Sequence, residues 1–244
     1  MLSELFKRNR RLLNESIQDP RRRTYISPAV YATDRALLPA LAEHARGVLL
    51  DVGAGDVPYR SLLAGQVDRH DTFDVEHRTD ALTYVGDIHD MHMVADNAYD
   101  TVLCLSVLEH VREPFRAIGE LARILRPGGR LILTVPHLSR LHEEPHDYFR
   151  YTQYGLRSLL ESAGLEEISI GAAGGLFAFL GHQVSTVLLC SVWHVPLLRG
   201  LAYWLNKWLV VRPIHWLDAR LDRRRIFALG YVCVAAKPAV GPEE

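Results

Sequence analysis

Residues 47–56, with the sequence GVLLDVGAGD, restrict the fold more than any other part of the chain. They form an apolar run that ends in an acid and then turns through two glycines separated by one small residue. Such a run is typical of a buried parallel strand, and the glycines let a ligand approach the backbone closely. Because open α/β sheets bind ligands at strand ends, the segment predicts a nucleotide-type site here.

Strand and helix patterns alternate along the rest of the chain. Helices are predicted at residues 60–63, 114–125 and 154–163, and strands at 47–52, 71–75, 99–106, 130–135, 168–170 and 227–235, with a short element at 81–85. This alternation predicts an α/β fold with a Rossmann-like, doubly wound and mostly parallel seven-stranded sheet. An apolar helical insertion is expected before the last strand.

We expect five parts along the chain. They are an N-terminal helical segment (1–46), a Rossmann-like core (47–170), a Trp-rich helical insertion (171–225), a final strand (226–237) and a tail (238–244). In the first part, residues 1–23 predict a basic amphipathic helix that packs on the domain, covers the site or contacts an anionic membrane. A second helix is predicted to begin at Thr33 or Asp34.

Composition argues against some classes of function. The 244 residues carry a net charge of −1, so the chain is not a polycation built to bind nucleic acid. Three widely spaced cysteines in apolar runs predict buried thiols of a reducing cytosol. The N-terminus lacks the apolar core of a signal peptide. We therefore expect a cytoplasmic protein, with a peripheral position at the inner membrane face as the alternative.

The spacing of the glycine turn indicates which cofactor it suits. A dinucleotide site needs a third glycine, and Pro58 occupies that position, so a cofactor without a pyrophosphate fits better. Asp74 ends the second strand, where a carboxylate can accept both hydroxyls of a ribose, and Asp87 ends the third, near an adenine amino group. Val75 and Ile88 would offer apolar faces to the ring. This pattern disfavours a nicotinamide dehydrogenase.

Five segments in order resemble the motifs of class I S-adenosylmethionine-dependent methyltransferases. They are Asp51-Val52-Gly53-Ala54-Gly55, Asp74, Gly86-Asp87-Ile88, Ser106-Val107-Leu108-Glu109-His110-Val111 and Leu125-Arg126-Pro127-Gly128-Gly129. The resemblance implies S-adenosylmethionine as the cofactor. It implies that Asp51 and the turn Gly53, Ala54 and Gly55 hold the methionine end. It also implies that Asp74 binds the ribose, that Asp87 binds the adenine, and that Leu105 and Ser106 line the site.

Two histidines are candidates for the base that a hydroxyl acceptor needs. His110 follows the fourth strand and His146 follows the fifth. The segment around His146 resembles a His-Asp-Tyr-x-Arg-Tyr/Phe-Thr stretch of some bacterial methyltransferases of glycan and small-molecule pathways. The predicted acceptor-binding residues are Glu109, His142, Asp147, Tyr148 and Arg150. The alternative is a self-satisfied loop, with Asp147 paired to Arg150 and Thr152 capping the next helix.

Residues 142–146 also fit the zinc-protease pattern His-Glu-x-x-His. That pattern requires a helix, in which residues four apart share a face, and Pro145 would break it. We therefore expect no metal site from this pattern.

Residues 171–222 interrupt the strand-helix rhythm and contain all four tryptophans, Trp193, Trp204, Trp208 and Trp216. Tryptophan gathers where one side is apolar and the other is wet. Residues 172–216 are therefore expected to pack on the core, to form a homodimer face or to lie in a membrane interface, with a membrane span as the least favoured option.

The sequence predicts an S-adenosylmethionine-dependent methyltransferase. The expected acceptor is oxygen of a small molecule, a sugar or a lipid-linked compound. The alternatives are an RNA or protein methyltransferase and a non-catalytic protein that keeps the cofactor fold as a scaffold. Ser106-Val107-Leu108-Glu109 replaces the Asn-Pro-Pro-Tyr type of motif, which disfavours exocyclic amines of bases.

Overall fold

The computed structural model describes residues 8–9, 12–13, 23–77 and 82–239. Most of the predicted basic helix at residues 1–23 therefore lies outside the described residues. The chain forms two compact units. The sheet unit comprises Leu37–Gly171 and Gly230–Glu244, and the helical unit comprises Met1–Ala36 and Ala172–Leu229, each within the described residues.

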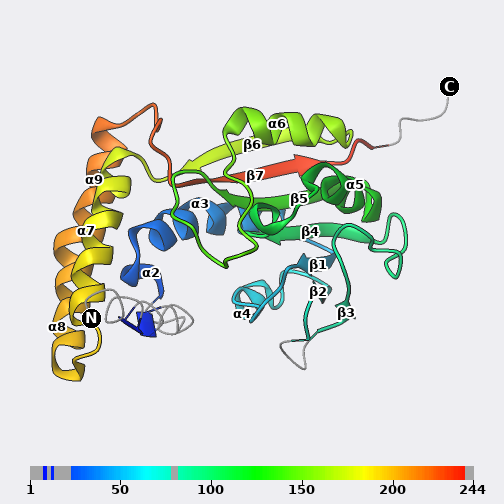
Figure 1. The fold of residues 1–244 in the computed structure, drawn as a ribbon. Coiled ribbons are helices and arrows are strands. Elements are labelled where there is room, and N and C mark those ends of the chain that lie inside the picture. The colour runs from blue at the N-terminus through cyan, green and yellow to red at the C-terminus, as the bar shows by residue number, and fades with distance from the viewer. Residues whose placement is uncertain (1–7, 10–11, 14–22, 78–81, 240–244) are drawn as a thin grey trace. The chain divides into compact units, whose positions relative to one another are not determined.

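The sheet unit contains a seven-stranded sheet with the order β3-β2-β1-β4-β5-β7-β6 (Figure 1). Its strands are β1 (Val48–Val52), β2 (Arg69–Asp74), β3 (Tyr84–Val85), β4 (Tyr99–Leu105), β5 (Leu125–Pro136), β6 (Glu166–Ala173) and β7 (Gly230–Ala236). Neighbours from β3 to β5 pair in parallel, and β7 pairs antiparallel with β5. The predicted α/β fold with a mostly parallel sheet is confirmed.

The strand order reverses between β1 and β4, which are neighbours although β2 and β3 intervene in the chain. Such a reversal is the topological switch point at which open α/β sheets bind ligands. Because β1 to β5 are parallel, their carboxyl ends share one edge of the sheet. The loops that follow these strands therefore meet at that edge.

The helices of the sheet unit begin at residues that suit a first turn. They are α4 (Arg60–Leu63), the 3-10 turn η1 (Leu108–His110), α5 (Pro114–Ile124) and α6 (Gln153–Ser162). Pro114 opens α5, where its missing N–H costs nothing, and Ala117, Ile118 and Leu121 form the buried face of that helix. The Thr152 hydroxyl caps α6 by accepting the Gly155 N–H (3.1 Å).

The helix α3 (Pro28–His44) corrects one prediction. It begins at Pro28 rather than at Thr33 or Asp34, because proline suits a first helical position and the Ser27 hydroxyl accepts the Val30 N–H (3.4 Å). Asp34 is instead buried inside the helix, where it forms an ion pair with Arg23 (3.4 Å).

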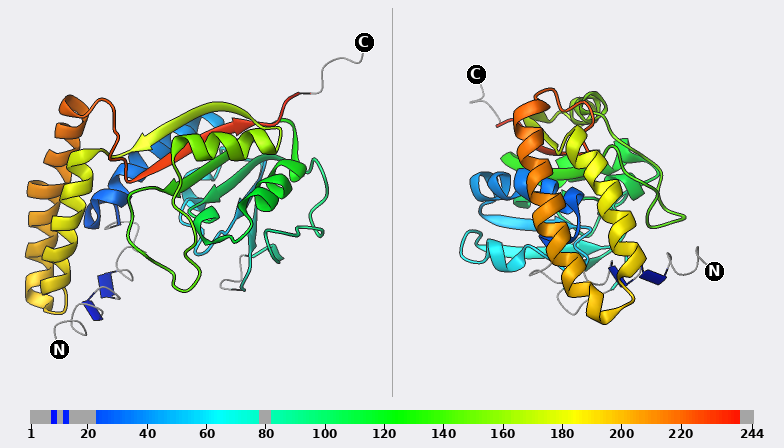
Figure 2. Two further views of the ribbon diagram at one scale, coloured as in Figure 1. Left: turned by 45° about the horizontal axis from the view of Figure 1, so that its top comes forward. Right: turned by 90° about the vertical axis from the view of Figure 1, so that its left-hand side faces the viewer.

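The helical unit is built on two antiparallel runs of helix (Figure 2). One run is α7 (Leu176–Val192), and the other joins α8 (Pro196–Leu205), the π-helical η2 (Asn206–Val211) and α9 (Arg212–Leu221). The short helix α2 (Arg23–Ile26) contacts η2. The chain enters this unit from β6, and Leu229 closes it by donating its N–H to the Ala173 carbonyl (2.9 Å).

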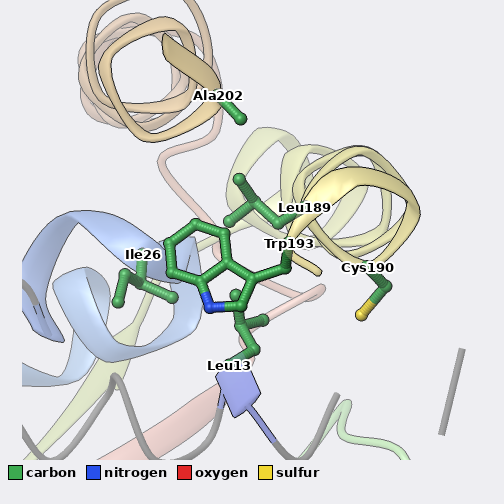
Figure 3. Close-up of a cluster of buried hydrophobic side chains, with 6 residues drawn as sticks. All are labelled: Leu13, Ile26, Leu189, Cys190, Trp193 and Ala202. Atoms are coloured by element: carbon green, nitrogen blue, oxygen red, sulfur yellow. The ribbon is translucent and has the colours of Figure 1, made fainter. Parts of the chain in front are cut away.

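Trp193 lies in the core of the helical unit (Figure 3). It is fully buried among Leu13, Ile26, Leu189 and Ala202. Trp193 is therefore a core residue of the helical unit, apart from the other three tryptophans of the insertion. A single tryptophan can fill the space between three helices, and residue spacing does not distinguish that position from a surface one.

The other three tryptophans of the helical unit are about half exposed. Leu197 and Leu209 on the same run are 89% and 66% exposed, so a broad apolar surface remains uncovered within the described residues. Asn206 takes the buried position instead, and its side-chain amide donates to the carbonyls of Tyr25 (2.8 Å) and Ile26 (3.1 Å). Among the described helices, none combines the length and apolarity needed to span a bilayer.

Candidate functional site

The glycine turn after β1 is tied to the end of β2. The N–H groups of Gly53 and Ala54 both donate to the Phe73 carbonyl (2.8 and 3.2 Å), and Gly55 donates to the Asp74 carboxylate (2.9 Å). These donors are thus used inside the protein rather than offered to a pyrophosphate. This agrees with the expectation of a cofactor without a pyrophosphate.

Both glycines of the turn have a backbone conformation that favours glycine, and Gly53 also has no space for a side chain. Gly53 has φ +70° and Gly55 has φ +49°, in the left-handed region that favours glycine. A Cβ at Gly53 would overlap Val107, whereas a Cβ at Gly55 would meet no atom within 4 Å. The turn therefore leaves open space beside Gly55 at the carboxyl edge of the sheet, where a ligand can approach the backbone.

Asp74 joins three strand ends. Its carboxylate accepts the N–H groups of Gly55 (2.9 Å) and Val75 (2.8 Å), and its carbonyl accepts the N–H of Gly86 after β3 (3.0 Å). The Glu76 N–H also lies 3.5 Å from this carboxylate, and because a carboxylate offers about four acceptor positions, capacity remains for a hydroxyl of a ribose. The predicted ribose-binding acid is therefore held rigidly and still has room for its ligand.

Asp51 is a carboxylate that needs a cation. It is 3% exposed, and burial raises its pKa above the usual range. His70 of β2 lies 3.6 Å away, beyond hydrogen-bond distance. A ligand with an ammonium or sulfonium group would compensate the cost of this buried acid, as the role implied for the methionine end requires.

Asp87 and Val75 are exposed, as an adenine site requires, whereas Ile88 is buried. The Asp87 carboxylate accepts the His89 N–H (2.9 Å), which lowers the pKa of Asp87. Val75 is 65% exposed and presents an apolar face to solvent. Of the two apolar residues expected beside the ring, Val75 has the better placement.

The end of β4 carries a strained residue at the expected site. Leu105 is the last residue of the strand, and Ser106 follows with φ +57°, which is uncommon for a residue with a side chain. Ser106 is held by its N–H, which donates to the Thr134 carbonyl (2.9 Å). Strained residues of this kind gather at functional sites.

The loop after β5, residues 137–152, is attached to η1. The Glu109 carbonyl accepts the N–H groups of Tyr148 (2.8 Å) and Phe149 (3.2 Å), and His110 Nδ1 lies 2.6 Å from the His146 carbonyl. Arg112 donates to the Tyr148 hydroxyl (2.9 Å) and lies over its ring. The structure thus brings together the two histidines that the sequence selects, from different loops.

Asp147 and Arg150 lock this loop internally. The guanidinium donates to both carboxylate oxygens (2.6 and 2.7 Å), and the Asp147 side chain is 2% exposed. This pair holds the pKa of Asp147 well below its usual range. The pairing, together with the Thr152 cap, matches the self-satisfied loop that the sequence left as an alternative. These two residues hold the loop rather than offer free groups to an acceptor.

Three residues of the site were missed by the sequence. Val107 lies against Gly53, Arg112 holds Tyr148, and the Tyr151 hydroxyl donates to the Leu108 carbonyl (2.9 Å). Each acts between two loops that are distant in the chain, and no spacing pattern within one loop signals such a contact.

Comparison with known proteins agrees with this geometry. Residues 50–133 match the family model described as a methyltransferase domain. Part of the chain is 33% identical over 85 residues to the tRNA U34 carboxymethyltransferase of Hahella chejuensis, covering 30% of this chain and 26% of that protein. Another segment is 38% identical over 50 residues to the ubiquinone biosynthesis O-methyltransferase of Xanthomonas oryzae pv. oryzae, covering 20% and 21%.

Solved structures share the fold at low sequence identity. The [4+2]-cyclase SpnF is 19% identical with a TM-score of 0.57, over 85% of this chain and 82% of that one. Phosphoethanolamine N-methyltransferase 2 of Haemonchus contortus, in complex with S-adenosyl-L-methionine, is 17% identical with a TM-score of 0.56, over 87% and 54%. At these identities the likeness shows the fold, and a fold can host several chemistries.

The residues present fit S-adenosylmethionine: a buried acid for its cationic end, a glycine turn with open space, and an anchored carboxylate for its ribose. The matched domain and the fold agree with that fit. Residues 50–133 therefore match a methyltransferase domain, and the fold and the geometry of the site suit S-adenosylmethionine as its cofactor.

Proposed function

We propose that this chain transfers the methyl group of S-adenosylmethionine to an oxygen atom of a small-molecule, sugar or lipid-linked acceptor. The observation that carries the proposal is the pair of loops at the carboxyl ends of β4 and β5. They bring His110, His142 and His146 together. Imidazole is the side chain best suited to remove a proton from a hydroxyl near neutral pH.

His146 is our candidate for the base. Its side chain is exposed, and its Nδ1 lies 3.0 Å from the Tyr148 hydroxyl. With the proton on Nδ1, the imidazole donates to the Tyr148 oxygen and keeps Nε2 free to accept a proton. Arg112 fixes the same Tyr148 oxygen from a second direction (2.9 Å). The ring that carries the base is therefore oriented by two residues of the site.

The methyl transfer itself is an in-line displacement. The acceptor oxygen forms a bond to the methyl carbon while the carbon–sulfur bond breaks and its electron pair goes to sulfur. The acceptor proton passes to His146 Nε2. The products are the methyl ether and S-adenosylhomocysteine. Since the sulfonium already activates the methyl group, the protein mainly contributes alignment and a place for the proton.

Labelled methyl transfer into fractionated extract of the source organism tests the acceptor class. We expect label in the polar or lipid pool. Label in RNA or protein alone would contradict the proposed acceptor class, and cofactor binding without label in any pool would indicate a scaffold role. With the labelled pool as substrate, His146→Ala should lower kcat by about 100-fold, because general acid–base groups contribute roughly that much. S-adenosylmethionine affinity should remain within about twofold.

A second proposal concerns the apolar surface of the helical unit. Trp208 and Trp216 lie under the guanidinium groups of Arg212 (4.0 Å) and Arg220 (4.5 Å). Exposed aromatic and leucine side chains next to cations match an anionic lipid surface, in which rings enter the interface and cations meet headgroups. We propose that this surface contacts the inner face of a membrane, which suits a lipid-linked acceptor.

Sedimentation with anionic vesicles tests the membrane contact. The protein should sediment at low salt and less at high salt, and the double variant Trp204→Ala with Trp208→Ala should bind several-fold less. The matched control is Phe115→Ala, which removes an equally exposed ring on α5. Absence of sedimentation at both salt concentrations would overturn this proposal, and a dimer in solution that Leu197→Asp dissociates would assign the surface to a homodimer.

A further inference from the structure

Glu109 is a buried acid whose carboxylate has no hydrogen-bond partner among the residues that the structure describes. Its residue is 0% exposed, and within the described residues neither carboxylate oxygen has a donor within hydrogen-bond distance. Its backbone carbonyl holds the loop after β5, which accounts for its position but not for its side chain. A buried polar group without a partner is costly, so such groups point to a ligand that would satisfy them.

Two imidazoles face this carboxylate. The Nε2 atoms of His142 and His110 lie 3.7 and 3.9 Å from Glu109 Oε1, longer than hydrogen bonds. The two rings stand nearly perpendicular, with centroids 4.8 Å apart. The three ligand atoms lie within 4.8 Å of one another. In a tetrahedral zinc site with bonds of about 2.0–2.1 Å, ligand atoms are about 3.4 Å apart. Small side-chain rotations would bring these atoms to that spacing.

The second nitrogen of each ring is oriented as metal-binding histidines require. His110 Nδ1 lies 2.6 Å from the His146 carbonyl, and His142 Nδ1 lies 3.2 Å from the Arg140 carbonyl. A carbonyl only accepts, so each Nδ1 carries the proton and each Nε2 keeps its lone pair in the neutral ring. Arg150 Nη2 also lies 3.4 Å from His142 Nδ1, but it donates to the Arg140 carbonyl at 2.7 Å.

We propose that Glu109, His110 and His142 bind one divalent transition-metal ion of the zinc type. Two imidazoles and one carboxylate suit zinc better than magnesium, which prefers oxygen ligands and water. Three protein ligands leave a fourth position open, as in catalytic zinc sites. This triad shares only His142 with the His-Glu-x-x-His spacing, which is why that spacing did not reveal it.

The proposed ion gives the acceptor site a chemical preference. This step rests on the proposed function. A hydroxyl of the acceptor occupies the open position, and coordination makes its proton more acidic before it passes to His146. Acceptors that can ligate a metal through oxygen, such as catechols or vicinal diols, are therefore favoured over isolated alcohols.

Metal binding to the full chain tests the site directly. After removal of metal with a chelator, the protein should bind one equivalent of zinc, and cobalt should give the absorption of a low-coordinate site. His142→Ala should weaken zinc binding by about 100-fold or more, since even changes behind the ligands cost 10–100-fold. Magnesium should not compete. The matched control is His92→Ala, which removes an exposed imidazole paired with Asp90.

The outcomes separate this site from the proposed function. Less than stoichiometric zinc in the wild type, or equal affinity in His142→Ala, would overturn the metal site. Glu109→Gln gives the same test, provided that this variant keeps the far-ultraviolet spectrum and the cofactor affinity of the wild type. If Glu109→Gln does not fold, His142→Ala alone decides, because His142 is partly exposed and its replacement is better tolerated. Zinc binding without methyl transfer to any pool would contradict the methyltransferase proposal and would still support the metal site.

Discussion

Asp147→Ala should lower methyl transfer by about 100-fold while S-adenosylmethionine affinity stays within about twofold. The variant removes the carboxylate that accepts hydrogen bonds from Nη1 and Nη2 of Arg150 and from the His142 N–H (2.9 Å). The loop that carries His142 and His146 then loses its internal lock. Misplacement of reacting groups by about 1 Å can cost about 100-fold in rate, whereas the cofactor residues lie on other strands.

The same variant should lower the free energy of unfolding by about 2–3 kcal/mol, because breaking a buried charge pair leaves one partner uncompensated. Arg150 is partly exposed, which places the expected loss below that of a fully buried pair. The pKa of Asp147 is lowered in the folded protein, so its contribution is complete above the ordinary pKa of about 3.9 and declines as the pH falls further.

Urea denaturation measures the change in the free energy of unfolding, and calorimetric titration with the cofactor measures the affinity. The control is Glu167→Ala, which breaks the exposed pair with Arg157 (2.6 Å) and should leave the unfolding midpoint nearly unchanged. Wild-type turnover in Asp147→Ala would show that the lock does not position the loop. A parallel loss of cofactor affinity would show that the damage is not local.

Gly53→Ala should weaken cofactor binding by at least 10-fold. The new Cβ would overlap the Val107 side chain, and alanine must also adopt φ +70°. The conformational cost is about 1 kcal/mol, and overpacking typically adds about 1–3 kcal/mol. Because Asp51 and Asp74 flank the turn, a displaced turn would misplace both acids.

A double-mutant comparison separates the two costs. Val107→Ala should restore part of the affinity lost in Gly53→Ala, because it removes the overlap but not the left-handed conformation. Gly55 has φ +49°, and a Cβ there would meet no atom within 4 Å. The thermal stability of unliganded Gly55→Ala should therefore show the conformational cost without the overlap. Calorimetric titration and thermal unfolding measure both terms. Equal affinity in Gly53→Ala with and without Val107→Ala would contradict the overlap.

The positions of the residues proposed to bind the cofactor could be predicted because they follow from the strand pattern. Asp74 ends β2 and Asp87 comes two residues after the end of β3, and parallel pairing places these positions on one edge of the sheet. The family resemblance added the roles of these acids. The alternation of strands and helices predicted the mostly parallel sheet, but not the order of its strands.

The acceptor half could not be predicted because it depends on contacts between loops. The burial of Glu109 arises where η1 meets the loop after β5, and nothing in either segment alone indicates it. The burial of Trp193 and the exposure of Trp204 likewise depend on which helix faces the others. Helical spacing identifies an apolar face but does not tell which surface covers it.

The hydrogen bond from Leu229 to Ala173 has a consequence for how this protein can diversify. It joins the two ends of the segment between β6 and β7, so this segment begins and ends at neighbouring positions. Pairing of β7 with β5 depends on residues 230–236 and not on the helices that precede Leu229. Evolution can therefore lengthen, shorten or exchange the intervening helices while the strands that carry Asp51 and Asp74 keep their register.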